Sequence, residues 1–190
     1  MKVVVMTCMI AVLLGCKSKD NNTKQKDTMK EDNKELAGLF EQYYEERLQL
    51  FPLEATAIGD PRYNDILPID FTDSYRDRTR RFFRRYLDEV KKYNREELSE
   101  NDQTSIDVFL YETEMNLESL DFRDNYFPFH QMSGIPLTLG QLGSGASYQP
   151  FKTVKDYDDW LKRASAFPAW ADSAIAYFSK GIREQYVLPT

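Results

Sequence analysis

Cysteine and histidine are nearly absent from this 190-residue chain, which has two cysteines and one histidine. Cys8 and Cys16 both lie at the front, so the rest of the chain has no thiol for a disulfide bond, a nucleophile or a metal site. Zinc catalysis commonly needs about three protein ligands, with histidine frequent among them. A lone His130 cannot supply them, and no Gly-x-Ser-x-Gly turn accompanies it to build a serine triad. We therefore expect no catalytic or metal-binding residue in this chain.

Phosphate-binding glycine motifs and a basic surplus are also missing. The glycines between residues 134 and 145 form neither Gly-x-Gly-x-x-Gly nor a loop ending in Lys-Ser/Thr, so nucleotide binding has no support. The formal charge of −6 disfavours nucleic acid as a partner. Carboxylates are numerous, but sequence does not set the separation of about 5 Å that a retaining glycosidase needs between two of them.

The first 16 residues have the pattern of a bacterial lipoprotein signal peptide. Lys2 precedes an uncharged run of 12 residues, which is too short to span a membrane and ends at a small residue. The segment Leu13-Leu14-Gly15-Cys16 resembles the lipobox, in which the cysteine thiol receives diacylglycerol before the peptidase cuts in front of it. We expect residues 1–15 to be removed and Cys16 to attach the protein to the membrane through its lipid.

Residues 16–33 are predicted to be the lipidated cysteine followed by a disordered tether. Beyond Cys16 this stretch is polar, with Met29 alone as a large apolar residue, and cannot bury enough surface to fold. The same polarity argues against residues 3–14 being a buried element, because nothing nearby could pack against them. Lys17 does not resemble an inner-membrane retention signal, so we expect export to the cell envelope and an outer-membrane destination.

Apolar residues recur every three or four positions in five segments, which is the pattern of amphipathic helices. These segments are residues 34–51, 72–93, 99–120, 153–164 and 168–182. Ser99 with Asp102 and Thr153 with Asp156 are spaced as capping boxes. The last two helices are expected to turn these residues inward: Tyr157, Trp160, Leu161, Ala164, Trp170, Ala171, Ala174, Ile175, Phe178 and Ile182. Without strand patterns, the prediction for residues 34–190 is a mainly α domain of antiparallel helices.

Two segments lack this periodicity. Residues 55–70 contain Gly59-Asp60-Pro61 and Leu67-Pro68, which indicate an ordered loop. Residues 121–152 mix aromatic side chains with glycine and proline, and an irregular segment of this length is usually functional. Within it, His130 is better interpreted as a hydrogen-bonded loop residue than as a metal ligand.

An arginine run lies on the second predicted helix, at Arg76, Arg78, Arg80, Arg81, Arg84 and Arg85. These positions spread around the helix, and Asp73, Asp77, Asp88 and Glu89 alternate with them. The pattern favours a solvated, ion-paired face. Contact with phosphate or anionic lipid headgroups is the alternative.

Several segments, in order, resemble one bacterial family named for a domain of unknown function, DUF885. They are FPLEATAIGDPRYND (residues 51–65), FPFHQMSG (127–134) and PFKTVKDY (150–157), continued by Phe167-Pro168, Gly181 and Tyr186-Val187. The resemblance covers residues 35–190 and implies a much longer helical protein, related in fold to zinc metallopeptidases and often exported as a lipoprotein.

The same resemblance implies where the chemistry lies. Family members carry a His-Glu-x-x-x-His zinc motif in their C-terminal half, and nothing before Thr190 matches it. We therefore expect a truncated N-terminal part, inactive alone, whose partner is the C-terminal remainder that holds the zinc. Residues 121–152 would line the channel of a peptide substrate, with these contacts: Tyr126, Phe127, Phe129, His130 and Gln131.

Function hypotheses from different classes remain open. The first is a lipid-anchored zinc peptidase or hydrolase of which this chain is the non-catalytic front. The second is an envelope lipoprotein that binds peptide or glycan on the aromatic loop without catalysis, and a third is a structural envelope protein. A zinc motif downstream of residue 190, with a later acidic ligand, would favour the enzyme.

Overall fold

The computed structural model describes residues 30–187, which form seven α-helices and three short 3-10 helices. Their bounds are α1 (Lys34–Leu50), α2 (Pro52–Ala57), η1 (Pro61–Tyr63), α3 (Asp73–Val90), η2 (Arg95–Glu97), α4 (Glu100–Ser119), η3 (Asp124–Tyr126), α5 (Ile135–Gly143), α6 (Val154–Ser165) and α7 (Phe167–Arg183). The mainly α prediction is confirmed, since these residues contain one isolated bridge and no strand. The predicted signal peptide, Cys16 and most of the tether lie outside the described residues.

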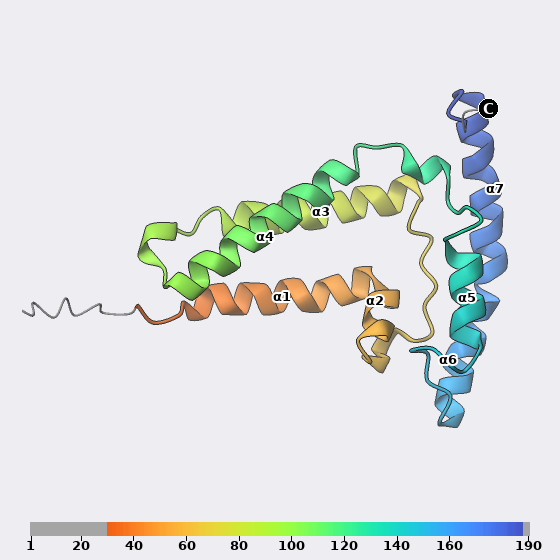
Figure 1. Cartoon of the computed structure of the whole chain (residues 1–190), viewed down its shortest axis with the longest axis horizontal. Helices are drawn as coiled ribbons and strands as arrows, with labels where there is room; N and C mark the ends of the chain where they lie inside the picture. Colours follow the sequence, from red (N-terminus) through yellow and green to blue (C-terminus); the bar gives the residue numbers. More distant parts are fainter. Residues whose placement is uncertain (1–29, 188–190) are drawn as a thin grey trace, which may run out of the picture.

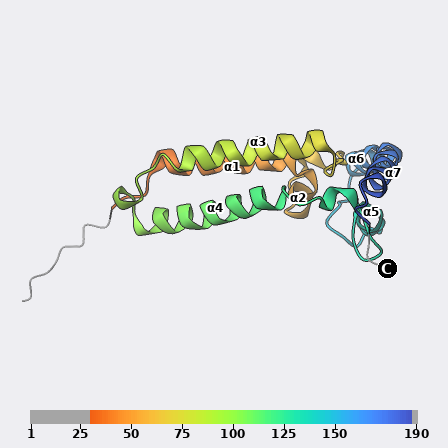
Figure 2. The same cartoon turned by 90° about the horizontal axis from the view of Figure 1, so that it is seen from above.

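Helices α1, α3 and α4 form a first layer that extends away from the rest of the molecule, with α3 antiparallel to both α1 and α4 (Figure 1). Seen from above, α1 and α3 overlap and α4 runs beside them (Figure 2). Tyr43 of α1 packs against Phe82, Tyr86 and Phe109, with ring centroids 4.8–5.1 Å apart. The first three predicted helices are therefore confirmed, and their apolar stripes meet in one core made of these buried residues: Leu36, Leu50, Tyr75, Phe82, Phe83, Tyr86, Val90, Leu98, Ile106 and Phe109.

The N-termini of α1 and α4 are joined by side-chain caps. Ser99 Oγ accepts a hydrogen bond from the Asp102 amide at 3.1 Å, which is half of the predicted capping box. The other half is wrong, because the Asp102 carboxylate accepts at 2.6 Å from the amide of Asn33, the N-cap of α1. Ser99 Oγ also donates to Asp32 at 2.6 Å, so the last two residues of the predicted tether contact the folded body.

Helices α5, α6 and α7 form a second layer that runs across one end of the first (Figure 1). Its core consists of Leu67, Phe71, Ile135, Trp170 and Ala174. The predicted fourth and fifth helices are confirmed as α6 and α7, and α6 starts with the full capping box of Thr153 and Asp156.

One buried arginine holds α6 to the preceding segments. Arg163 is 0% exposed and donates from Nε to the Ile66 carbonyl at 3.0 Å and from Nη1 to Gln149 Oε1 at 2.7 Å. Its Nη2 donates to Thr56 Oγ1 at 2.8 Å and to the Tyr63 carbonyl at 2.7 Å. Burial lowers the pKa of this guanidinium to about 10. The cationic side chain therefore serves as a polar centre of the second layer.

Two predicted loops contain helices. Pro52 ends α1 as expected but also opens α2, because proline fits the first turn of a helix. Helix α5 occupies part of the segment 121–152 that was expected to be irregular. Its Pro136, Gly140 and Gly143 resemble loop residues, yet the proline again lies in the first turn. A Cβ on Gly143 would lie 2.6 Å from Trp160 Cζ2, so this glycine permits close packing against α6.

The predicted inward faces of α6 and α7 are partly wrong. Tyr157 and Leu161 are 54% and 63% exposed, because the hydrogen bonds of Arg163 turn α6 so that Asp159 and Arg163 are buried. Ile175 and Ile182 of α7 are also exposed. Trp170 and Ala174 of α7 are buried as predicted, and Gly181, which was not part of the predicted face, is buried with them. No helix within residues 30–187 is long and apolar enough to cross a membrane.

Candidate functional site

The segment after α4 is held against α3 by two arginines. Arg76 Nη2 donates to the carbonyls of Leu120 and Phe122 at 3.0 and 2.7 Å, and Arg80 Nη2 donates to the Leu120 carbonyl at 2.7 Å. The same guanidinium groups pair with acidic side chains of this segment, as Arg80 does with Asp121 at 2.8 Å. These bonds cap the C-terminal carbonyls of α4 and direct the chain toward α7.

His130 lies in a tight turn that its own ring closes. The amide of His130 donates to the Ser133 carbonyl at 3.0 Å, and the amide of Ser133 returns the bond at 3.2 Å. His130 Nδ1 accepts from the Met132 amide at 3.2 Å, and Nε2 lies 2.8 Å from Ser133 Oγ. Since Nδ1 accepts, the proton of the neutral ring is on Nε2 and is donated to Ser133. His130 is thus a hydrogen-bonded loop residue.

The five residues expected to line a channel lie around a single pocket of about 550 Å³. They are Tyr126, Phe127, Phe129, His130 and Gln131. Helix α7 and the residues after it form the opposite wall, with Phe178, Ile182, Tyr186 and Val187. We call this cavity the aromatic pocket. In Figure 1 the segment between α4 and α5 runs alongside the half of α7 nearer the C-terminus.

Tyr126 of the aromatic pocket is held by hydrogen bonds and by packing. Its hydroxyl donates to Glu184 Oε2 at 2.9 Å, and Arg123 binds the same carboxylate oxygen at 2.9 Å. A Cβ on Gly181 would lie 3.1 Å from Tyr126 Cβ, so glycine allows α7 to approach this closely. The ring also packs edge-on against Tyr186, with centroids 5.7 Å apart.

The C-terminal cap of α7 places Tyr186 in the wall of the aromatic pocket. Gln185 has φ 59°, and the amides of Gln185 and Tyr186 donate to the carbonyls of Ile182 and Gly181 at 3.1 and 2.8 Å. This is the Schellman arrangement, in which a left-handed residue satisfies the last helical carbonyls. Sequence reasoning missed this wall, although Tyr186-Val187 belongs to the family resemblance and Phe178 and Ile182 were assigned to the core.

The aromatic pocket is lined mainly by apolar and aromatic side chains, with His130 and Gln131 as polar groups at one side. Among residues 30–187 no cluster of three or more histidine, cysteine, aspartate or glutamate side chains could hold a metal ion. The described residues therefore do not fit the zinc that the family resemblance implies.

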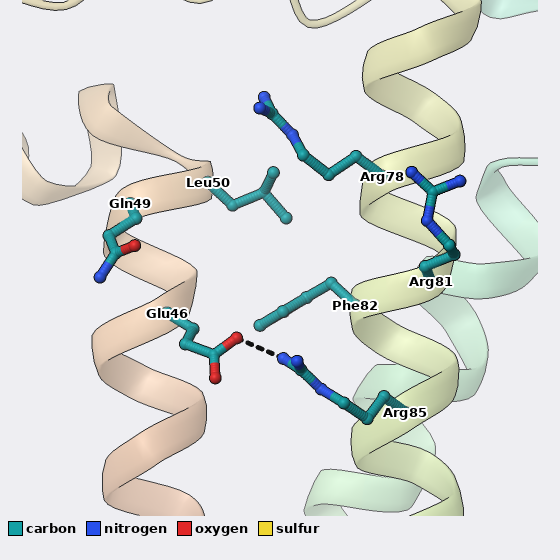
Figure 3. A pocket seen from close by; sticks show the side chains of 7 residues that line it. All are labelled: Glu46, Gln49, Leu50, Arg78, Arg81, Phe82 and Arg85. Atoms are coloured by element: carbon teal, nitrogen blue, oxygen red, sulfur yellow. Dashed lines mark hydrogen bonds and ion pairs between the residues drawn. The ribbon is translucent and has the colours of Figure 1, made fainter.

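A second pocket lies between α1 and α3 (Figure 3). Its lining comprises Glu46, Gln49 and Leu50 from α1 and Arg78, Arg81, Phe82 and Arg85 from α3, around a volume of about 450 Å³. We call it the arginine pocket. Burial of Glu46 acts to raise the pKa of its carboxyl, but hydrogen bonds from Arg85 and Tyr86 outweigh this and lower the pKa. Glu46 is therefore a stable anion on one wall.

Comparison with known proteins identifies the family. Residues 52–190 match the family described as "Bacterial protein of unknown function (DUF885)", so the chain belongs to the DUF885 family. This match confirms the family resemblance seen in the sequence. No curated protein and no solved structure matches the chain.

Proposed function

We propose that this chain is the N-terminal, non-catalytic part of an exported, lipid-anchored DUF885 protein, and that its aromatic pocket lines a peptide substrate channel. The observation that carries the proposal is the meeting of Tyr126, Phe127, Phe129, His130 and Gln131 in one pocket against α7. In the whole protein, zinc-dependent hydrolysis would be performed by residues beyond Thr190. Lipid on Cys16 would hold the protein at the outer membrane.

The aromatic pocket suits an apolar peptide side chain. Volumes of about 300–1,000 Å³ are typical of ligand pockets, and aromatic walls with a few polar groups are their usual lining. Phe129 packs against Phe178 and Trp170 with centroids 5.2 and 5.9 Å apart, so its ring is supported by these two α7 residues. Gln131 is exposed at the edge, where its amide could bond a peptide backbone.

Zinc chemistry is not assigned to any residue of this chain. The sequence has one histidine, and the ring nitrogens of His130 are both engaged within its own turn. In the proposal, the zinc ligands and the general base therefore come from the C-terminal remainder, and this segment contributes substrate contacts and helical cover.

A binding lipoprotein without catalysis is the second candidate function. It is favoured by the pocket itself, because exposed faces and edges of aromatic rings can contact peptides and glycans without a nucleophile. The two candidates share the aromatic pocket and differ in whether bound ligand is cleaved.

Titration calorimetry with peptides carrying phenylalanine or leucine, and with oligosaccharides, tests the shared claim. Phe129→Ala should weaken binding about tenfold or more, since an aromatic side chain that a ligand covers contributes about 1.5–3 kcal/mol. Phe122→Ala is the matched control, because Phe122 is 63% exposed and lies outside the aromatic pocket. Equal effects of the two substitutions, or no binding by the unaltered chain, would refute the pocket as a ligand site.

A further inference from the structure

The arginine pocket presents three cationic side chains on one face of α3. Arg78, Arg81 and Arg85 are spaced by three and four residues, so their side chains project together from successive turns. Figure 3 shows all three on the α3 side of the cavity, where Arg78 and Arg85 reach toward α1 and Arg81 lies along α3. Helix geometry therefore places the three arginines on one face of α3, and the packing of α1 against α3 forms the cavity beside them.

Positive charge exceeds negative charge in the lining. Arg85 pairs with Glu46, whose other carboxylate oxygen accepts from the Tyr86 hydroxyl at 2.9 Å. Neither Arg78 nor Arg81 has an ion-pair partner within residues 30–187. Arg78 instead lies over the Tyr75 ring at 4.8 Å, which orients the guanidinium and leaves its charge uncompensated. Two of the three cations are thus available to an anion.

The opposite face of α3 uses its arginines differently. Arg76 and Arg80 each bind a carboxylate and main-chain carbonyls at the end of α4. Their positions are fixed by these structural bonds. The ion-paired face expected from the sequence is therefore correct for part of the arginine run, whereas Arg78 and Arg81 line a cavity.

The floor of the arginine pocket is apolar. Phe82 and Leu50 are 7% and 6% exposed and lie beneath the charged groups. A cavity of about 450 Å³ exceeds the size of a bare inorganic anion. Guanidinium groups bind phosphate oxygens in a bidentate manner, and the floor offers contact for carbon atoms next to the phosphate.

We propose that the arginine pocket binds a phosphate group attached to a small aliphatic moiety, such as glycerol phosphate, with Arg78 and Arg81 as the principal ligands. The group can come from a soluble phosphate ester or from a phospholipid headgroup. Arg85 contributes from its pair with Glu46, which limits the total charge of the pocket. The proposal is independent of the aromatic pocket.

Two probes distinguish the sources: glycerol 3-phosphate in titration calorimetry, and phosphatidylglycerol vesicles against phosphatidylcholine vesicles in co-sedimentation. Residues 1–29 are the same in every variant, so differences between variants report on the pocket. Arg78→Ala and Arg81→Ala should each weaken binding about tenfold, as expected for a hydrogen bond to a charged group. Arg84→Ala removes the same charge from the same helix outside the arginine pocket and should change binding less than about twofold.

Glu46→Gln provides a gain-of-binding test that misfolding cannot imitate. Removal of this carboxylate should strengthen binding severalfold, because the only acidic group of the lining is lost. Binding of glycerol 3-phosphate with this pattern establishes a soluble ligand, and binding of phosphatidylglycerol vesicles alone with the same pattern establishes a headgroup. Equal weakening by Arg84→Ala and Arg81→Ala, or no binding of either probe, would overturn the proposal.

Discussion

Arg163 shows how one residue determines the packing of a whole layer. It is a fully buried cation without a directly bonded carboxylate, and it instead donates to two carbonyls, a hydroxyl and an amide oxygen. Such groups are stable only when their donors are satisfied, because an unpaired buried polar group is costly. The four acceptors lie in α2, in η1, just after η1 and just before α6, so Arg163 joins these segments to α6.

Replacement of Arg163 should therefore destabilise the second layer strongly. Arg163→Met leaves four acceptors without this donor and should lower the free energy of unfolding by about 3 kcal/mol or more. Urea denaturation followed by circular dichroism measures the change. Lys162→Met is the control, since Lys162 is 69% exposed and should change stability by less than about 1 kcal/mol. Similar losses in both variants would contradict this account of Arg163.

Gly134 has a conformational role next to the aromatic pocket. Its φ is 123°, and a Cβ there would lie 2.4 Å from Phe129 Cβ. Gly134→Ala should lower the free energy of unfolding by about 1–3 kcal/mol and displace Phe129. Gly140→Ala, inside α5 with nothing within 4 Å of its Cβ, should instead stabilise by about 1 kcal/mol. Thermal unfolding of the two variants compares the directions of the two effects, and a destabilised Gly140→Ala would contradict the predicted gain in helix propensity.

The carboxyl of Glu46 should make stability depend on pH. Its pKa is lowered in the folded state, so its contribution is present above the unfolded value of 4.5 and is lost as the pH falls. Glu46→Gln should lower the free energy of unfolding by at most about 1 kcal/mol at neutral pH. The difference from the unaltered chain should disappear in acid. Denaturant titrations at pH 7 and pH 3 test this, and a constant difference would refute it.

At the scale of elements, the start of α4 is joined to the start of α1 by Asp102. The carboxylate is buried and accepts from the Asn33 amide at 2.6 Å. Asp102→Ala should cost about 2 kcal/mol, as expected for a hydrogen bond to a charged group, and should increase hydrogen exchange at the front of α1. Glu118→Ala, exposed on the same helix, is the control. Unchanged exchange near Asn33 in Asp102→Ala would contradict this coupling.

Sequence periodicity predicted the long helices well because each has neighbours on one continuous face. Helix α3, for example, buries Tyr75, Phe82 and Tyr86 as its pattern indicates. Sequence periodicity could not predict α5. Its Gly143 suggested a loop, but in the structure this glycine allows close packing against Trp160. The orientation of α6 was also not predicted. Charged residues usually lie at the surface, whereas Arg163 is buried.

The site was predicted to a similar extent. The family resemblance, applied to an irregular segment rich in aromatic residues, led to the near wall of the aromatic pocket, from Tyr126 to Gln131. The far wall depends on which side of α7 meets this segment and on the left-handed Gln185 that turns Tyr186 back. Those are long-range and conformational facts that no local pattern encodes.

At the scale of the whole molecule, the two layers leave large apolar side chains uncovered. Leu161 and Ile175 are 63% and 64% exposed. Under the proposed function, the C-terminal remainder covers such positions. Leu161→Gln should change the stability of residues 34–190 by less than about 0.5 kcal/mol, as for other surface positions, and should destabilise a protein that extends beyond residue 190 by more. Equal small effects in both proteins would argue against a cover at this position.

The most direct test of the central claim is peptide cleavage by a protein that continues past Thr190, measured together with its zinc content. The proposed function predicts bound zinc, cleavage that a chelator abolishes, and a fall in kcat/KM of about tenfold in Phe129→Ala but not in Phe122→Ala. Absence of zinc with cleavage that chelators do not affect would contradict it, as would equal activity of the Phe129→Ala variant and the unaltered protein.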